Sequence, residues 1–290
     1  MFPFINPKTD FAFKKIFGSP QNKDILISFL NALLYEGTTT IRDLQLLDPY
    51  QAPPLKGVKE SFLDVKASLS NGKTVIIEMQ VLNVLGFKKR VLYNAAKALS
   101  IQLDVGDDYN LLNPVIALTI TDFEMFEDSD KVVSRYRLKE RDDLTDYSDD
   151  IELVFAELPK FRKSIEELDS LTDKWLYFLK EANHLEAVPE RLGEEPAIQN
   201  AFEVARHSRL TRDELETLNR QSMFIHDSRN AVRLGVQQGI EQGVQQGIEQ
   251  GKKEAQMEIA RSLRSQLSIE QISQTTGLTI SEIESLQDTN

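Results

Sequence analysis

The sequence predicts an α/β protein, in which a β-sheet carries helices on its faces and a helical extension follows. Two observations lead to this prediction. Up to residue 121 the apolar pattern gives the order helix, helix, strand, strand, strand, helix, strand, and a sheet covered by helices buries such a set. From residue 168 onward the pattern is helical almost throughout.

Two helices are expected at the N-terminus, over residues 7–17 and 22–35. Thr9 or Asp10 can cap the first helix, and apolar residues recur in both helices at helical spacing. Asp10 and Lys14 are four residues apart, so their side chains share one helix face and can form an ion pair.

A β-hairpin with two acidic residues is expected over residues 62–80, which read FLDVKASLSNGKTVIIEMQ. The turn includes Gly72, an isolated Asp64 lies in the first strand, and Glu78 and Gln80 lie in the second. Burying an unpaired carboxylate is costly. Two carboxylates in one hairpin therefore require a cation or a proton to neutralise them.

Two turn lengths are possible for this hairpin. A two-residue turn puts Val65 opposite Glu78 and mixes apolar with polar side chains on each face. A three-residue turn over residues 70–72, with the glycine in the left-handed conformation, puts Asp64 opposite Glu78. This second register also gathers one apolar face, formed by Leu63, Val65, Ala67, Val75, Ile77 and Met79. We predict the three-residue turn, because a slip of one residue would move every side chain to the opposite face.

The pair of Asp64 and Glu78 is best explained by a divalent ion, because like charges placed opposite each other repel. Oxygen ligands suit Mg²⁺ or Mn²⁺, and the backbone carbonyl of Met79 is a candidate further ligand. Such an ion could activate water and stabilise charge on a phosphodiester. Gln80 can orient water or phosphate but brings no charge, and Lys66 on the same face is a candidate for that charge. Alternatively, Asp64 lies at a strand edge and pairs with Lys66 or a helix residue.

The rest of the core is expected to contain a first strand, a long helix, a buried strand and a strand pair, over residues 41–47, 87–103, 112–121, 131–139 and 150–158. Arg90 and Tyr93 lie beside the apolar stripe of the long helix. The expected domains are a core, a helical subdomain, a glycine repeat and a small helical tail, over residues 1–165, 166–232, 233–254 and 255–290.

The glycine repeat reads GVQQGIEQGVQQGIEQG over residues 235–251, with glycine at every fourth position. Glycine in a helix costs about 1 kcal/mol relative to alanine, but small residues also let two helices approach closely. A self-associating helix and a linker without a dedicated role both remain open.

The tail has the outline of a helix-turn-helix. Ser268 and Gln271 form a capping-box pattern, Gly277 can end that helix, and Thr279 or Ser281 can start the next. The tail has few basic residues, so DNA recognition by this unit would be unusual. A role in assembly is the simpler interpretation.

Composition narrows the class of protein further. The chain has 290 residues, a net charge of −12 and no cysteine, which excludes disulfides and zinc-thiolate sites and fits a reducing compartment. No apolar run approaches the ~18–20 residues that span a bilayer, and the N-terminus lacks the features of a signal peptide. We therefore expect a cytoplasmic protein without a membrane partner. The acidic net charge argues against broad nucleic-acid binding, so any contact with DNA would be confined to a local basic patch.

Several stretches resemble, in order, the PD-(D/E)XK nuclease-family transposases, also called the recombination-promoting nuclease family. They are PKTDFAFKKIFG, NKDILISFLNALL, FLDVKASLSNGKTVIIEMQ, RVLYNAAKALSIQL, PVIALTITDF and DKWLYFL, and they cover roughly the first 180 residues. The resemblance implies a restriction-endonuclease-like αβββαβ core, followed here by the C-terminal helical extension. It also implies Mg²⁺-dependent cleavage of DNA.

The resemblance also assigns roles to acidic residues. Asp64, Glu78 and Gln80 fall on the D…ExQ positions of the family. Gln80 stands where the broad superfamily has lysine, a substitution that recurs in the family. Asp10 falls on an N-terminal acidic position that can bind metal or water.

The candidate substrate-binding residues are Lys14, Lys66, Arg90 and Tyr93, and the resemblance places the last two on the helix that faces the site. We predict a DNA endonuclease that uses Mg²⁺ (or Mn²⁺), has a link to DNA recombination or mobile elements, and forms homo-oligomers through its C-terminal helices. Two alternatives remain open: a catalytically weak or inactive nuclease fold that serves as an oligomerising interaction module, and a DNA-reading regulator that uses the tail helices.

Overall fold

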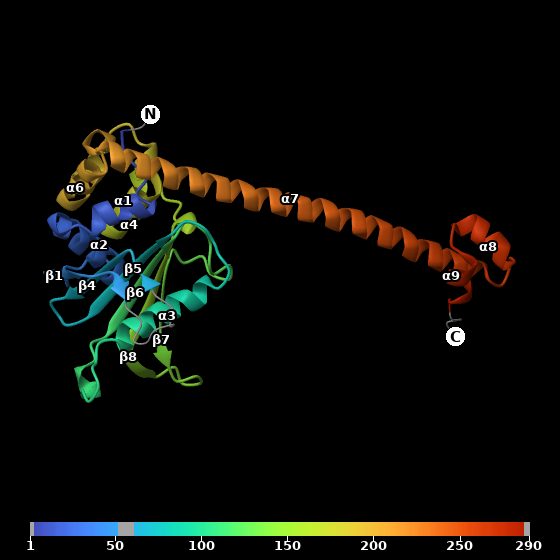
Figure 1. Cartoon of the computed structure of the whole chain (residues 1–290), viewed down its shortest axis with the longest axis horizontal. Coiled ribbons are helices and arrows are strands. Elements are labelled where there is room, and N and C mark those ends of the chain that lie inside the picture. The colour runs from blue at the N-terminus through green and yellow to red at the C-terminus, as the bar shows by residue number, and fades with distance from the viewer. Residues whose placement is uncertain (1–2, 52–60, 287–290) are drawn as a thin grey trace. The chain divides into compact units, whose positions relative to one another are not determined.

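The computed structural model describes residues 3–51 and 61–286 and divides into two compact units, residues 1–226 and 227–290 (Figure 1). Each unit is described by itself below. The larger unit contains the sheet, and the smaller one is entirely helical.

The larger unit is built on a mixed six-stranded sheet with the strand order β1-β4-β5-β6-β8-β7. Its strands are β1 (Leu44–Leu47), β4 (Val65–Leu69), β5 (Thr74–Gln80), β6 (Val115–Thr121), β7 (Val133–Lys139) and β8 (Asp146–Glu157). The three central strands β5, β6 and β8 are parallel, and the outer pairings are antiparallel. A separate two-stranded pair consists of β2 (Tyr50–Gln51) and β3 (Ser61–Phe62). The predicted α/β fold is confirmed.

Helices cover both faces of this sheet (Figure 1). One face carries α1 (Asp10–Phe17), α2 (Lys23–Tyr35), α4 (Leu171–Glu181) and α6 (Pro196–Val204), and the other carries α3 (Phe87–Ser100). A short α5 (Glu190–Gly193) precedes α6. Strand β6 shows why both faces need cover, because all of its residues are buried and they alternate between the two sides.

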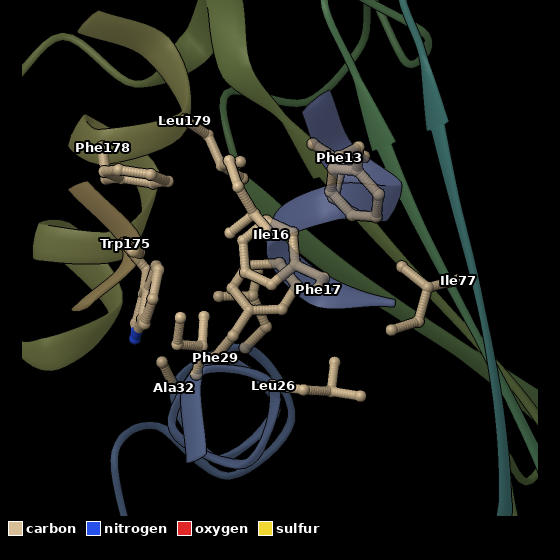
Figure 2. Close-up of a cluster of buried hydrophobic side chains, with 14 of the residues drawn as sticks. Phe13, Ile16, Phe17, Leu26, Phe29, Ala32, Ile77, Trp175, Phe178 and Leu179 are labelled. Atoms are coloured by element: carbon tan, nitrogen blue, oxygen red, sulfur yellow. The ribbon is translucent and has the colours of Figure 1, made fainter. Parts of the chain in front are cut away.

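The main core lies between the sheet and the larger group of helices. The ring of Phe29 lies 4.6 Å from that of Phe17 and 5.6 Å from that of Trp175, measured between centroids. Figure 2 shows these rings gathered between the helices, with Ile77 of β5 on the sheet side. Buried residues of α4 and α6 belong to this same cluster. Helices α4 and α6 therefore share the core of the sheet.

The β4–β5 hairpin has the register predicted for the three-residue turn. Val65 lies opposite Ile77 and Ala67 opposite Val75. Gly72 has a φ of +87°, the left-handed conformation that this turn requires. The hairpin therefore presents its apolar side chains to the main core as expected.

The expectation for Leu63 is wrong. Regular β4 begins at Val65, and the chain bends at Asp64, whose carboxylate accepts a hydrogen bond from the backbone N–H of Met79 at 2.7 Å. Leu63 packs instead in the cluster on the α3 side of the sheet, together with Ile76. The side-chain hydrogen bond of Asp64 therefore ends the alternation that the sequence pattern implies.

Helix α7 (Arg212–Leu263) contains the whole glycine repeat, which is therefore helical. The part of α7 that belongs to the larger unit includes the buried Leu218, and Glu214 there pairs with Lys15 of α1 at 2.5 Å. Among the described residues, no helix combines the length and the apolar character needed to cross a membrane.

The smaller unit contains the rest of α7 with α8 (Ile269–Thr276) and α9 (Ile280–Glu284). Ser268 caps α8 in a capping box, as predicted, and Gly277 ends it with a φ of +74°. Thr279, rather than Ser281, caps α9. A small core holds this unit together and consists of Ala260, Ile272, Leu278, Ile283 and Leu286.

Candidate active site

A pocket of about 770 Å³ lies where the end of β5, the chain before β4 and the first half of α3 meet. It brings together most of the residues that the sequence assigned to the site: Asp10, Asp64, Glu78, Met79, Gln80, Arg90 and Tyr93. These residues come from α1, the hairpin and α3, which are far apart in the chain. Their convergence makes this pocket the candidate active site.

The carboxylate of Asp64 is 15% exposed and lies between two donors. Its Oδ2 accepts the hydrogen bond from Met79, and its Oδ1 lies 3.5 Å from Nζ of Lys14. Burial raises the pKa of Asp64 to about 7. The Met79 N–H and the Lys14 ammonium oppose this rise, and the nearby Asp10 carboxyl adds to it. Near neutral pH, an additional cation would therefore favour the charged form of Asp64.

Lys14 of α1 is the cation that faces Asp64. Its Nζ also lies 2.5 Å from Oδ1 of Asp10, so the predicted pair on α1 is present. Thr9 sets the start of this helix, because its hydroxyl accepts a hydrogen bond from the backbone N–H of Ala12. Partial burial lowers the pKa of Lys14, but Asp10 and Asp64 raise it more, and the net shift is upward. Lys14 is thus a stable positive charge at the pocket.

Strand β5 presents Glu78 to the same pocket, with its side chain 13% exposed. Asn94 of α3 donates a hydrogen bond to Oε1 of Glu78 at 3.0 Å, and Nε of Arg90 lies 4.0 Å from the same oxygen. Burial raises the pKa of Glu78, and Arg90 and Asn94 oppose that rise. Two largely buried carboxyls with raised pKa values therefore line one pocket.

Both ends of the Gln80 side chain are engaged within the protein. Its Oε1 accepts a hydrogen bond from Nη2 of Arg90 at 2.6 Å, and its Nε2 donates to the carbonyl of Leu82 at 2.7 Å. The guanidinium of Arg90 also stacks over the ring of Phe87, 4.8 Å from the centroid. Gln80 thus holds Arg90 in place, and the guanidinium of Arg90 brings a positive charge next to Gln80.

Lys66 lies on β4 but is not among the described residues that line the pocket. Burial lowers the pKa of Lys66, and the carboxylate that opposes this shift belongs to Asp48. Of the two lysines considered from the sequence, Lys14 is therefore the one beside Asp64. Tyr93, on α3, does line the pocket and is 40% exposed.

Two further side chains hold the acidic residues in place, although the sequence did not assign them to the site. Asn94 is one, and its spacing of four from Arg90 was an available signal, because such residues share a helix face. Gln221 of α7 is the other. It donates to Oδ2 of Asp10 at 3.4 Å and accepts a hydrogen bond from the backbone of α1 at 2.9 Å. No local pattern in the sequence links Gln221 to α1.

The oxygen donors of the pocket fit a hard divalent cation. Asp64 and Glu78 are carboxyls whose charged forms are disfavoured by burial, and a bound cation would offset that cost. Among residues 3–51 and 61–286, no group of three or more His, Cys, Asp or Glu side chains is arranged to hold a metal. A metal at this pair would therefore take further ligands from backbone or water oxygens, as Mg²⁺ commonly does.

The chain matches the family model of the PD-(D/E)XK nuclease family transposases over residues 7–235, which is more than half of its length. It therefore belongs to this family. No curated protein and no solved structure gives a significant match. The family is one of nucleases, a class that generally uses divalent metals and has DNA as its substrate, so the assignment supports a nuclease-type hydrolase. It also agrees with the fold predicted from the sequence.

Proposed function

We propose that this protein is a Mg²⁺-dependent DNA endonuclease, with Mn²⁺ as the alternative ion, that hydrolyses phosphodiester bonds in the pocket. The observation that carries the proposal is the convergence of Asp64 and Glu78, two largely buried carboxyls with raised pKa values, beside Lys14 and Arg90. Uncompensated buried charge is costly, so such a pair indicates a functional site more readily than a structural one.

In this proposal Asp64 and Glu78 hold the metal together with the backbone carbonyl of Met79, and Asp10 assists from α1. The bound ion would act as a Lewis acid on the phosphate and would lower the pKa of the attacking water. Met79 contributes in a second way, because its N–H orients the Asp64 carboxylate.

The cationic residues bind the substrate. Lys14 favours the charged form of Asp64 and is near enough to contact a phosphate oxygen. Arg90 holds the DNA backbone, and Tyr93 contacts the DNA from the same helix. Lys66 contacts the DNA outside the pocket. Gln80 acts through Arg90, since both ends of its side chain are already bonded.

The test is cleavage of supercoiled plasmid DNA with Mg²⁺ by the wild type and by Asp64→Ala. We expect the wild type to nick and linearise the plasmid and the variant to lose at least about 10²-fold in rate, the scale of losing a key transition-state contact. Asp146→Ala removes a carboxylate on β8 whose side chain is 64% exposed, and should behave as the wild type. Equal rates of cutting by the wild type and by Asp64→Ala would contradict the proposed enzymatic activity.

A second candidate is a catalytically weak or inactive nuclease fold that serves as an interaction module. The observation that favours it is the engagement of Gln80 within the protein, at the position where the broad superfamily has lysine. Calorimetric titration with Mn²⁺ separates the two candidates. The enzyme should bind the ion in a manner lost in Glu78→Gln, and the interaction module should show no carboxylate-dependent binding.

Self-association through the C-terminal helices is part of the proposal. Along the repeat, four apolar residues recur at every fourth position and are 57–61% exposed: Val236, Ile240, Val244 and Ile248. Solvent-exposed apolar side chains in a row favour a helical partner. Deleting residues 235–251 should lower the mass measured by light scattering, and an unchanged mass would favour the linker interpretation.

A cytoplasmic location and a role in DNA recombination complete the proposal. The chain contains no cysteine, which fits a reducing compartment. The family's description as transposases supports the link to recombination.

A further inference from the structure

The candidate active site has an apolar and aromatic rim around its charged residues. Phe62 of β3 is 67% exposed and lines the pocket, as does the fully exposed Leu85 in the loop before α3. Val84 and Tyr93 add further partly exposed apolar surface to the same lining. Large apolar side chains that gather at one pocket mark a binding surface.

The rim and the charged interior are both ordered by contacts within the protein. Phe62 lies opposite Tyr50 in the β2–β3 pair, and their rings are 4.9 Å apart with an interplanar angle of 34°. Arg90 is held by Gln80, yet its buried Nε has no hydrogen-bond partner among the described residues. A buried donor without a partner is costly, so the Nε is suited to a ligand oxygen such as that of a phosphate.

The charges of the pocket are poorly suited to an intact double helix. Its lining contains Lys89 and Arg90 together with Asp10, Asp64 and Glu78. Lys14 lies beside the lining, and its charge is already paired with Asp10 and Asp64. Proteins that track duplex DNA neutralise several phosphates at once and derive most of their non-specific affinity from this effect. Proteins that bind single strands add the stacking of bases on aromatic rings, worth about 1–3 kcal/mol per base, to their charge contacts with the backbone.

We propose that the pocket takes an unpaired DNA strand, with bases stacked on Phe62 and Tyr93 and packed against Leu85. The phosphate that follows the stacked bases then reaches Asp64 and Glu78. This inference rests on the proposed nuclease function and specifies its substrate class: single strands, flaps and overhangs. Within a duplex both faces of each base are covered by neighbours, so the rim has no base face to contact.

The test uses three labelled DNAs of one sequence: a single strand, a blunt duplex, and a duplex with a single-stranded overhang, each with Mg²⁺ or Mn²⁺. The wild type should cut the single strand and the overhang at least tenfold faster than the blunt duplex. Phe62→Ala should raise KM for the single strand by about tenfold, the loss expected for one stacked base. It should slow the cutting of the duplex much less.

The matched control is Tyr147→Ala, which removes an aromatic ring that is 83% exposed on β8 and does not line the pocket. Tyr147→Ala should change neither the rate of cutting of the single strand nor that of the duplex. A strand with abasic sites beside the scissile phosphate separates stacking from folding. The wild type should cut this strand at least as slowly as Phe62→Ala cuts the normal strand, and Phe62→Ala should show no further loss on the abasic strand.

Equal rates on strand and duplex, or the same loss for Phe62→Ala on the abasic strand, would overturn the inference. If no DNA is cut, the proposed nuclease function fails, and fluorescence anisotropy with the same three DNAs then decides this inference separately. The inference is supported if the single strand binds at least tenfold more tightly than the duplex and if Phe62→Ala weakens this binding. Equal or absent binding would overturn it.

Discussion

Nζ of Lys14 on α1 lies 3.5 Å from Oδ1 of Asp64, at the bend that precedes β4. Lys14 therefore brings a positive charge to the carboxylates of the pocket, while position 80 carries a glutamine that is bonded to Arg90. In the proposed enzyme, α1 supplies part of the charge that the hairpin itself lacks.

Replacing Lys14 by alanine should reduce the rate of DNA cutting by about 10²-fold, since removal of one group that stabilises developing charge typically costs that much. Lys14→Arg should retain more activity because it keeps the charge. Lys66→Ala removes the same charge from a position that faces Asp48 rather than Asp64, and should reduce the rate much less. Initial rates on one plasmid substrate at saturating Mg²⁺ provide the comparison, and equal losses for the two alanine variants would contradict this role of Lys14.

Asn94→Ala should weaken metal binding by about tenfold or more, because residues that orient a metal ligand have effects of about 10–100-fold. The variant leaves Glu78 without the hydrogen bond that opposes its raised pKa. Calorimetric titration with Mn²⁺ measures the change. Leu92→Ala, at a site 53% exposed on the same helix, serves as the control. Unchanged affinity in Asn94→Ala would show that Asn94 does not support the metal site.

In the presence of a chelator, the free energy of unfolding should fall as the pH rises from about 4 to about 7. Burial raises the pKa of Asp64 from 3.8 to about 7 in the folded protein. Within that window the unfolded chain has released a proton that the folded protein still binds, so raising the pH favours unfolding. Urea titrations at several pH values test this. Asp64→Asn removes the titrating group and should show a smaller dependence on pH, and an identical dependence would point to other groups.

Phe29→Ala should lower the free energy of unfolding by about 3–5 kcal/mol, the usual cost of removing a buried aromatic side chain. Its ring contacts both Phe17 and Trp175 at the centre of the main core (Figure 2). Phe224→Ala, at a site 67% exposed on α7, should change it by no more than about 0.5 kcal/mol. Urea denaturation compares the two, and a similar cost for both variants would contradict the assignment of the core.

The glycine repeat offers a test in which stability and assembly change in opposite directions. Outside its own helix backbone, a Cβ added at Gly239, Gly243 or Gly247 meets no atom within 4 Å among the described residues, so alanine should favour the helix by up to about 1 kcal/mol at each position. In an oligomer whose helices approach closely at these glycines, the same alanines would hold the helices apart. We expect unchanged or increased helicity by circular dichroism together with a lower mass by light scattering.

The matched control for the repeat has the same spacing one position earlier in the chain and replaces Gln238, Gln242 and Gln246 by alanine. Its mass should equal that of the wild type. A glycine variant that keeps the mass of the wild type would show that the glycine face is not an interface.

The hairpin register could be predicted because two local constraints agree, the apolar alternation and the left-handed conformation required of Gly72. The position of Leu63 could not be predicted, because a side-chain hydrogen bond from Met79 to Asp64 bends the chain there. Such a bond depends on tertiary approach and leaves no periodic signal.

The same reasoning applies to the charges around the site. The ion pair of Lys14 with Asp10 follows from helix geometry, but the contact of Lys14 with Asp64 depends on how α1 packs on the sheet. Sequence spacing placed Lys66 on the face of the carboxylates, yet it does not line the pocket that holds them. Gln221 holds Asp10 from a helix late in the chain, and only the folded core brings the two together.

The central claim is that Asp64 and Glu78 together bind a divalent ion. The most direct measurement is the anomalous scattering of Mn²⁺ soaked into crystals of the wild type and of Glu78→Gln. The account predicts a peak in the wild type within bonding distance of both carboxylates, at about 2.0–2.6 Å as for hard cations, and its loss in the variant. A wild-type pocket without a peak, or a peak that does not contact Asp64 and Glu78, would contradict it.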